Sequence, residues 1–334
     1  MTISQAQVRA RLDSLAKPPG SLGRLEDLAV LLALTQQRQD PLTTPRRLVL
    51  FAGDHGVVAQ GVTPWPSAVT TAMVRTILSG KATSTVFARL HGVDVRVVDC
   101  GIAEPVEEIR AAHYRAAPVA RGTQDLSQGP AMSATQFDKA WAIGADEARR
   151  AIGDGCRLLI AGEMGIGNTT PSACLVHLLT MADADSATGY GAGADDAMRA
   201  RKRDVVAAAV ARLGGAKDKA ALAAISGFEI VAMAGFLAEG ASGGASLLID
   251  GYVVTAAALI AEHLAPGSRH AMIAAHRSAE PGHGAALAQL GLEPLLEWDM
   301  RLGEGTGALT ALPLLDAAAA LLGEVATLAE VLGA

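Results

Sequence analysis

A single glutamate, Glu304, lies between two glycines in the segment RLGEGTGALT, residues 301–310, and an uncharged run, GALTALPLL, follows it. Glycine on both sides lets another group come close to the backbone. A carboxylate beside an apolar run ordinarily has a partner, because burying an unpaired charge is costly. Taken alone, the better interpretation of Glu304 is an acid near the start of a helix beginning at about residue 306, where the helix dipole favours it.

The segment GEMGIGNTTPSACL, residues 162–175, is the strongest local motif. It predicts a strand that enters a glycine turn and then a helix, with Pro171 in the first helical turn. Exposed amides at such a junction attract phosphate. Thr170 stands where the dinucleotide fingerprint GxGxxG needs its last glycine, and the GK[ST] of a P-loop is absent. A purely structural strand–helix turn is the alternative.

Two histidine-containing segments could in principle bind a metal. In GDHG (residues 53–56), Asp54 and His55 are better explained as a structural pair, with the aspartate capping a turn. In HRSAEPGH (residues 276–283), the spacing of His276, Glu280 and His283 matches none of the standard zinc motifs. We therefore expect no metal.

A glycine loop also precedes a helix in GYGAGADDAMRARKR, residues 189–203. Asp195 and Asp196 fit the first turn of that helix, where its dipole favours acids, and Lys202 follows about two turns later. Paired aspartates can hold magnesium, but in enzymes of diphosphorylated ribose such a pair directly follows an apolar strand. Here it follows ATGYGAGA, which favours the helix start.

Short β-branched runs that alternate with Ala-rich segments predict the fold. The runs cover residues 47–56, 93–101, 157–165, 245–251 and 270–278. Three of them are almost continuously apolar, as in strands buried on both faces of a parallel sheet. The alternation predicts an α/β fold, a three-layer Rossmann-like open parallel sheet. Ligands of such sheets bind beyond the carboxyl ends of the strands. Polar residues gather at those ends: Asp54, His55, Asp99, Glu163, Asp250, His276 and Ser278.

The two ends of the chain fall outside this pattern. Residues 1–37 form a helical segment broken by KPPGSLG, and residues 285–333 are helical and rich in Ala and Leu. We expect them to pack together. The predicted division is a large Rossmann-like domain, 38–284, and a smaller helical domain made from 1–37 plus 285–334.

Composition narrows the functional class. Half of the 334 residues are hydrophobic but only 3% are aromatic, so the core must be built from Ala, Val, Leu and Ile. The net charge of −6, without a basic stripe, argues against nucleic acid as a partner. Three widely spaced cysteines suit a reducing cytoplasm rather than a disulfide framework. The N-terminus has no apolar signal region. The longest uncharged run, 164–182, contains Asn168 and Pro171 and indicates a loop entering a helix, not a membrane span.

Six collinear motifs resemble one family. They are KPPGSLGRLE, GDHGVVAQGVTPWP, GEMGIGNTT, IDGYVVTAAAL, HRSAEPGH and RLGEGTGA, and they span nearly the whole chain. Together they are similar to nicotinate-nucleotide–dimethylbenzimidazole phosphoribosyltransferases of cobalamin assembly. The resemblance implies transfer of phosphoribose from nicotinate mononucleotide to dimethylbenzimidazole or a related azole. It also implies a homodimer, with no metal and no cofactor.

The resemblance assigns roles to particular residues. The glutamate of the family's GEG motif is its catalytic base, and it falls on Glu304. The lysine after the GAGxDD segment contacts ligand in the family, and Lys202 matches it. The other expected substrate-binding residues, carried by the same motifs, are Pro64, Trp65, Glu163, Met164, Gly165, Gly167, Asn168, Thr169, Asp250 and Ser278. Two positions depart from the pattern. Where the family has glutamine near the azole, in VTxQM, this chain reads VTTAM, with Ala72, and upstream it has Pro64 where a small polar residue is common.

The implied reaction suits these residues. The pyridinium leaves as a neutral ring, so neither an acid nor a metal is needed to help it depart. The attacking azole loses the proton of its other nitrogen, and one carboxylate can accept it. Two other classes stay open: a nucleotide-dependent dehydrogenase, against which the missing GxGxxG counts, and a non-catalytic azole-binding protein.

Overall fold

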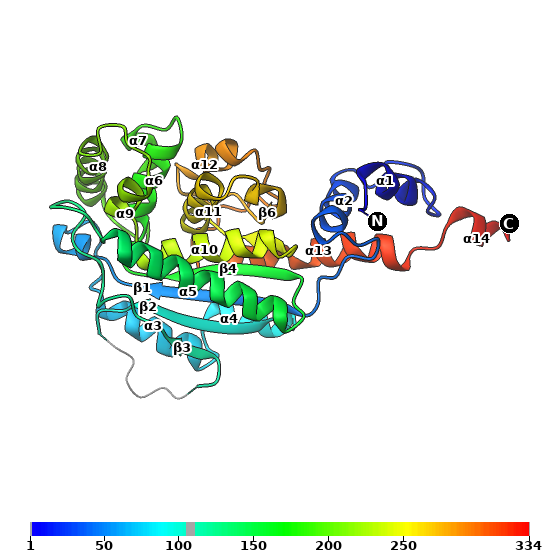
Figure 1. The fold of residues 1–334 in the computed structure, drawn as a ribbon, viewed down its shortest axis with the longest axis horizontal. Coiled ribbons are helices and arrows are strands. Elements are labelled where there is room, and N and C mark those ends of the chain that lie inside the picture. The colour runs from blue at the N-terminus through cyan, green and yellow to red at the C-terminus, as the bar shows by residue number, and fades with distance from the viewer. Residues whose placement is uncertain (1, 105–110, 334) are drawn as a thin grey trace.

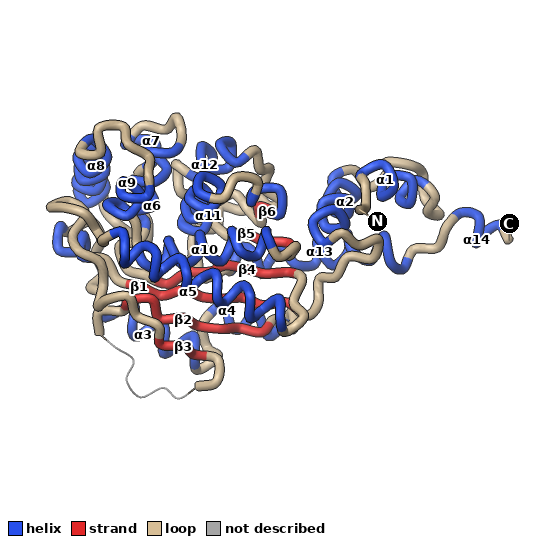
Figure 2. Tube along the Cα trace, viewed as in Figure 1, coloured by secondary structure: helices blue, strands red, loops and turns tan. Residues whose placement is uncertain are grey.

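The computed structural model describes residues 2–104 and 111–333 (Figure 1). Its centre is a six-stranded parallel sheet in the order β3-β2-β1-β4-β5-β6 (Figure 2). The strands are β1 (Arg46–Gly53), β2 (Asp94–Gly101), β3 (Tyr114–Ala116), β4 (Leu158–Met164), β5 (Ser246–Ile249) and β6 (Met272–Ala274). The predicted open α/β fold is confirmed.

Helices cover both faces of the sheet. The α-helices are α1 (Gln5–Asp13), α2 (Arg24–Gln36), α3 (Ala68–Leu78), α4 (Thr83–Leu90), α5 (Ala134–Gly153), α6 (Thr169–Leu179), α7 (Ala184–Ala187), α8 (Asp196–Ala211), α9 (Lys219–Ile225), α10 (Phe228–Ser242), α11 (Tyr252–Leu264), α12 (His283–Leu290), α13 (Thr306–Glu324) and α14 (Leu328–Leu332). Two short 3₁₀ helices are η1 (Gly56–Gln60) and η2 (Ser268–Ala271).

Strand β1 shows how the sequence builds two cores. All eight of its residues are buried, and successive side chains point to opposite faces. Val49 and Phe51 belong to the core shared with α5, α6, α10 and α11. Leu48 and Leu50 belong to the core shared with α2, α3, α4 and α13. The continuous apolar run therefore reflects burial on both faces, as predicted.

Five of the six strands match the predicted runs, and β3 does not. It is three residues long, pairs only with β2 at the sheet edge, and none of its residues is buried. A strand this short and exposed has no hydrophobic pattern to detect. The fourth and fifth predicted runs are also shorter in the structure than in the sequence, because their flanking residues enter loops.

The two ends of the chain lie side by side, away from the carboxyl ends of the strands (Figure 1). Ser14 O accepts from Leu328 N at 2.9 Å, and Ala326 O accepts from Ala16 N at 2.9 Å. Helix α12 instead packs on α11, and the amides of Leu295 and Leu296 donate to the carbonyl oxygens of Ala274, the last residue of β6, and of Ala275 after it. Where the helical domain begins stays a prediction; these contacts favour a boundary near residue 305 over one at 285.

Helix α13 is unusually long and apolar. Within the described residues, it is the one helix that could cross a membrane by length and composition, and half of that stretch is buried inside the fold. Its apolar side chains, including Leu309, Leu312 and Leu315, pack in the core with α2. Core packing therefore accounts for its composition. The uncharged run 164–182 is a loop followed by α6, as predicted.

Candidate active site

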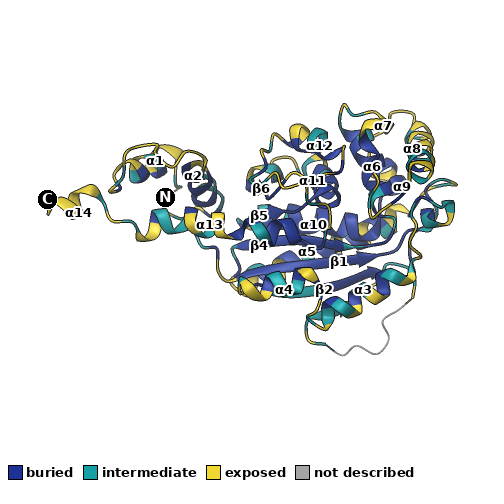
Figure 3. Ribbon diagram, turned by 180° about the vertical axis from the view of Figure 1, so that it is seen from behind, coloured by how far each residue is buried: buried dark blue, intermediate teal, exposed yellow. Residues whose placement is uncertain are grey.

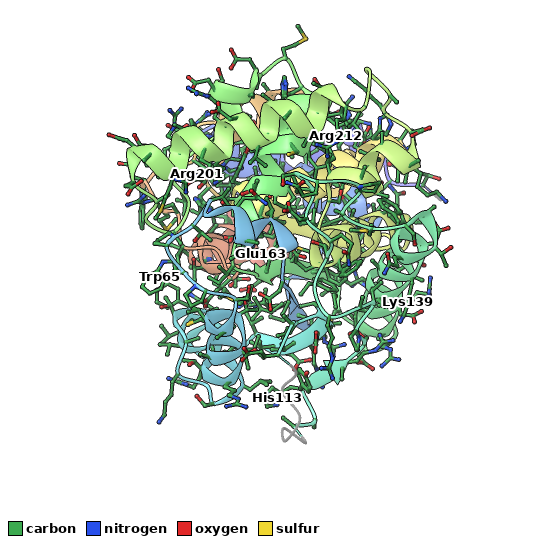
Figure 4. The ribbon with its side chains drawn as sticks, turned by 90° about the vertical axis from the view of Figure 1, so that its left-hand side faces the viewer. Trp65, His113, Lys139, Glu163, Arg201 and Arg212 are labelled. Carbon is green, nitrogen blue, oxygen red and sulfur yellow. The ribbon has the colours of Figure 1, made fainter. Side chains whose placement is uncertain are left out.

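A cavity lies at the carboxyl ends of β4, β5 and β6, where ligands of open parallel sheets bind. Figure 4 looks onto this end of the molecule, with Glu163 near its centre. The lining combines the ends of three strands with three loop segments, residues 62–63, 190–192 and 301–303. It includes Glu163, Gly167, Asn168, Thr169, Tyr190, Gly191, Asp250, Tyr252, His276, Ser278, Glu280, Arg301 and Gly303.

Glu163, the next-to-last residue of β4, forms part of the cavity floor. Its Oε2 accepts a hydrogen bond from Asn168 Nδ2. A Cβ at Gly303 would lie 2.3 Å from Oε1, so a side chain there would displace the carboxyl group of Glu163. Burial raises the pKa of Glu163 to about 8, and the nearby carboxylates of Asp250, Glu229 and Glu304 add to the rise. At neutral pH Glu163 is mostly protonated.

Glu304 lies in an unusual backbone segment beside the cavity. Its φ is 59°, and those of Gly303 and Gly305 are 88° and 77°. A left-handed conformation is unfavourable for a residue with a Cβ, and such strain tends to gather at functional sites. The side chain is buried, and Ser84 Oγ donates to Oε2 at 2.9 Å. Burial raises the pKa of Glu304, while the hydrogen bond from Ser84 acts against the rise.

Asp250, just after β5, fixes the segment that carries Glu304. Its Oδ2 accepts from Gly305 N at 3.1 Å, and its Oδ1 accepts from Ala308 N at 3.0 Å. Asp250 thus caps α13 from a distant part of the chain. The acid at the start of α13 is Asp250, and Glu304 points instead to Ser84 on α4. Asp250 lines the cavity, but both of its carboxylate oxygens already accept hydrogen bonds from backbone N–H groups.

The turn before α6 has the strand–turn–helix geometry predicted from the sequence. Asn168 is the N-cap of α6, Thr169 is its first residue, and Pro171 lies in the first turn, as predicted. Gly167 has φ 90°, so the turn requires glycine there. Gly165 is packed against Gly53, whose carbonyl oxygen would lie 2.4 Å from an added Cβ, and it does not line the cavity.

Lys202 lies behind this turn, on α8. Its Nζ donates to Thr169 Oγ1 at 2.6 Å and to Gly189 O at 3.3 Å. Burial lowers the pKa of Lys202 to about 8, and the charge of Glu280 opposes that shift. Lys202 reaches the cavity through Thr169. Asp195 caps α8 by accepting from Met198 N, which agrees with the predicted helix start.

Four more of the expected binding residues lie outside the cavity lining. Met164 is half-buried at the end of β4, and Pro64 is exposed. Trp65 is 48% exposed and donates from Nε1 to Ala192 O at 2.8 Å, so it holds the 190–192 loop (Figure 4). Ala72 is exposed on α3. These residues were expected in the lining because they belong to the family's motifs, but a motif does not tell which of its side chains face the cavity.

Comparison with known proteins places this site in a family. The family model described as Phosphoribosyltransferase matches residues 2–331. The chain belongs to this phosphoribosyltransferase family.

Full-length relatives agree with the assignment. The chain is similar to a protein of Ralstonia nicotianae, 44% identical over 326 residues, 97% of this chain and 92% of the relative. It is also similar to one of Mycolicibacterium paratuberculosis, 46% identical over 329 residues, 97% of this chain and 93% of the relative. Both are named nicotinate-nucleotide–dimethylbenzimidazole phosphoribosyltransferase. The crystal structure of CobT from Thermus thermophilus matches with a TM-score of 0.94 and 44% identity, covering 98% of each chain. The family resemblance predicted from the motifs is confirmed.

Asp54 and His55 have protein partners in this phosphoribosyltransferase. Asp54 accepts from Thr70 Oγ1 at 2.6 Å and from Ala103 N at 2.9 Å, as expected of a structural residue. His55 Nε2 lies 2.9 Å from Glu229 Oε1, and both side chains are buried in the core. Across the described chain, no three His, Cys, Asp or Glu side chains are grouped to hold a metal ion.

Proposed function

We propose that this phosphoribosyltransferase moves phosphoribose from nicotinate mononucleotide to dimethylbenzimidazole, or to a related azole, during cobalamin assembly. The products are α-ribazole phosphate and nicotinate. The names of the relatives support the substrates. The observation that carries the mechanism is the buried carboxylate of Glu304, in a left-handed segment beside the cavity.

Glu304 is the proposed general base. The azole attacks C1 of the ribose through one ring nitrogen, and nicotinate leaves as its pyridinium nitrogen takes back the bonding electrons. The other azole nitrogen then loses its proton to Glu304. A raised pKa makes a carboxylate a better base while it stays deprotonated. Glu163, with a pKa of about 8, is mostly protonated at neutral pH and is the weaker candidate.

The phosphate of the donor is proposed to bind at the start of α6. The start of a helix carries partial positive charge that attracts anions, although in α6 Thr170 N already donates to Gly167 O at 3.0 Å and Pro171 has no N–H. Thr169 and Asn168 line the cavity at this point. Lys202 stands behind Thr169 and adds positive charge. In this proposal the phosphate binds at the α6 end of the cavity, and Gly303, the residue before Glu304, lines another part of the wall.

The test is to mix the purified protein with nicotinate mononucleotide and dimethylbenzimidazole and to measure nicotinate and α-ribazole phosphate by chromatography. We expect both products in equal amounts. Azole binding without nicotinate release would support a binding protein instead. Reduction of a nicotinamide dinucleotide by a co-substrate, without either product, would support a dehydrogenase.

Metal independence can be tested in the same assay. The leaving pyridine ring needs no Lewis acid, so activity after exhaustive chelation is expected to stay within about twofold of the untreated enzyme. A loss of more than about tenfold that magnesium restores would contradict this, and would point to Asp195 and Asp196 as ligands.

We also propose that the protein works as a cytoplasmic homodimer. Cys100, Cys156 and Cys174 are buried and unpaired, which suits a reducing compartment.

A further inference from the structure

A strip of three polar side chains forms one wall of the cavity after β6. Residues 276–280 alternate strictly: His276, Ser278 and Glu280 are buried and line the cavity, whereas Arg277 and Ala279 are exposed. A period of two is the side-chain pattern of an extended chain. The strip therefore presents an imidazole, a hydroxyl and a carboxylate to the same space.

Two buried polar atoms in this wall have no hydrogen-bond partner in the described structure, Nδ1 of His276 and Oε2 of Glu280, and of these the carboxylate oxygen can only accept. Glu280 is 7% exposed, and its Oε1 accepts from Gly191 N at 2.9 Å. Its Oε2 is buried without a hydrogen bond. The oxygen lies against Gly189, where an added Cβ would come within 2.1 Å of it and would displace the carboxyl group. Buried carboxylate oxygens are rarely left unbonded, because the loss of hydration is costly. A ligand donor is the natural partner.

The chemistry of the donor substrate identifies that partner. At neutral pH the phosphate, the carboxylate and the pyridinium ring of nicotinate mononucleotide offer essentially no hydrogen-bond donors. Its two ribose hydroxyls are donors. Glu280 would repel both anionic groups and attract a hydroxyl hydrogen. Carboxylates bind ribose hydroxyls in this way in dinucleotide sites.

We propose that Glu280, with Ser278 beside it, binds the ribose hydroxyls and makes the enzyme select ribosyl over deoxyribosyl donors. This inference rests on the proposed function. Ser278 Oγ lies 3.4 Å from Glu280 N, so the two side chains are neighbours on the same wall. Both precede His283, whose Nδ1 accepts from Ser278 N at 2.7 Å and holds the strip in place. The azole N–H is the other hydrogen-bond donor among the substrates, and its proposed partner is Glu304.

The experiment compares kcat/KM for nicotinate mononucleotide and for its 2′-deoxy and 3′-deoxy forms. A hydrogen bond to a charged acceptor is typically lost at a cost of about 10–100-fold. The wild-type enzyme is expected to disfavour at least one deoxy donor by that factor. The Glu280→Gln variant is expected to lose most of this preference, because its activity falls on the ribosyl donor and changes little on the deoxy donor. The KM for dimethylbenzimidazole should stay within about threefold.

Arg277→Ala is the matched control. Arg277 is next in the chain but faces away from the cavity and pairs with Glu297, so this variant should keep the wild-type preference. Equal losses of Glu280→Gln on all three donors would overturn the inference and indicate a structural role. If Glu280→Gln does not fold, the wild-type comparison decides alone: a preference below about threefold for both deoxy donors overturns it. Absence of nicotinate release by the wild type with the ribosyl donor would instead overturn the proposed function, and the inference with it.

Discussion

Glu304 combines three features at the scale of the single residue: burial, one hydrogen bond from a hydroxyl, and a left-handed backbone. Glu304→Gln keeps the shape but cannot accept a proton. We expect kcat to fall about 10²–10⁴-fold, with little change in the KM for nicotinate mononucleotide, whose phosphate binds elsewhere. Circular dichroism and the melting temperature should stay near those of the wild type. A folded variant that keeps more than about a tenth of kcat, with chemistry rate-limiting, would exclude Glu304 as the base.

Ser84 affects the pKa of the Glu304 carboxylate. Its hydroxyl donates to Glu304 Oε2 and holds the pKa of Glu304 below the value that burial alone would give. In Ser84→Ala the pKa of Glu304 should therefore rise further. Because the base works only when deprotonated, the acidic limb of the pH profile of kcat/KM should move to higher pH. Thr85→Ala is the control: Thr85 donates to Ala82 O on the same helix and should leave the profile unchanged. A shift to lower pH, or none, would contradict the role of Ser84.

At the scale of the element, α13 begins where Asp250 caps it, and this cap also fixes the Glu304 segment. Asp250→Asn replaces one acceptor oxygen by a donor and removes the charge that the helix dipole favours. We expect a loss of about 1–2 kcal/mol in the free energy of unfolding, the typical value of a cap. We also expect kcat to fall about 10–100-fold, because small displacements of a catalytic group have effects of that order.

A second capping aspartate separates the two effects. Asp218 caps α9 by accepting from Ala221 N, away from the cavity. Asp218→Asn should lower the melting temperature without lowering kcat. If Asp250→Asn likewise changed only stability, the position of Glu304 would not depend on the cap.

The sequence predicted the local features of the site but not the contacts between residues that are distant in the chain. The β4–α6 junction was predictable in full because its strand, glycine turn and proline are adjacent in the chain. The partners of Glu304 were not, because Ser84 is 220 positions away and Asp250 caps Ala308 across 58 positions. The alternation of buried and exposed side chains in 276–280 could not be predicted either, because four of these five residues are polar and the apolar one, Ala279, is exposed. The inward side of the 63–72 region could not be read from motif identity at all.

At the scale of the whole molecule, the C-terminal helix has an apolar face that nothing in the described chain covers. Helix α14 contains no buried residue. Leu328, Val331 and Leu332 are 53%, 61% and 71% exposed, and their spacing of three and four places them on one face. Figure 3 shows α14 as an exposed segment at the end of the molecule that holds both termini. A capping box at Thr327 and Glu330 gives this short helix a defined start. An ordered but uncovered apolar face is typical of an interface.

We therefore predict that a second copy of the chain covers α14. Light scattering should give the mass of a dimer for the wild-type protein. The double variant Val331→Asp and Leu332→Asp places two charges on the face and should shift the protein toward the monomer, since burying unpaired charges is costly. Met181→Asp is the control, because Met181 is 98% exposed and lies in the chain between α6 and α7. These two helices are at the opposite end of the molecule from α14 (Figure 1), so this variant should leave the dimer intact. A monomeric wild type would exclude the pairing. A double variant as dimeric as the wild type would place the interface elsewhere, and the apolar face of α14 would then need another partner.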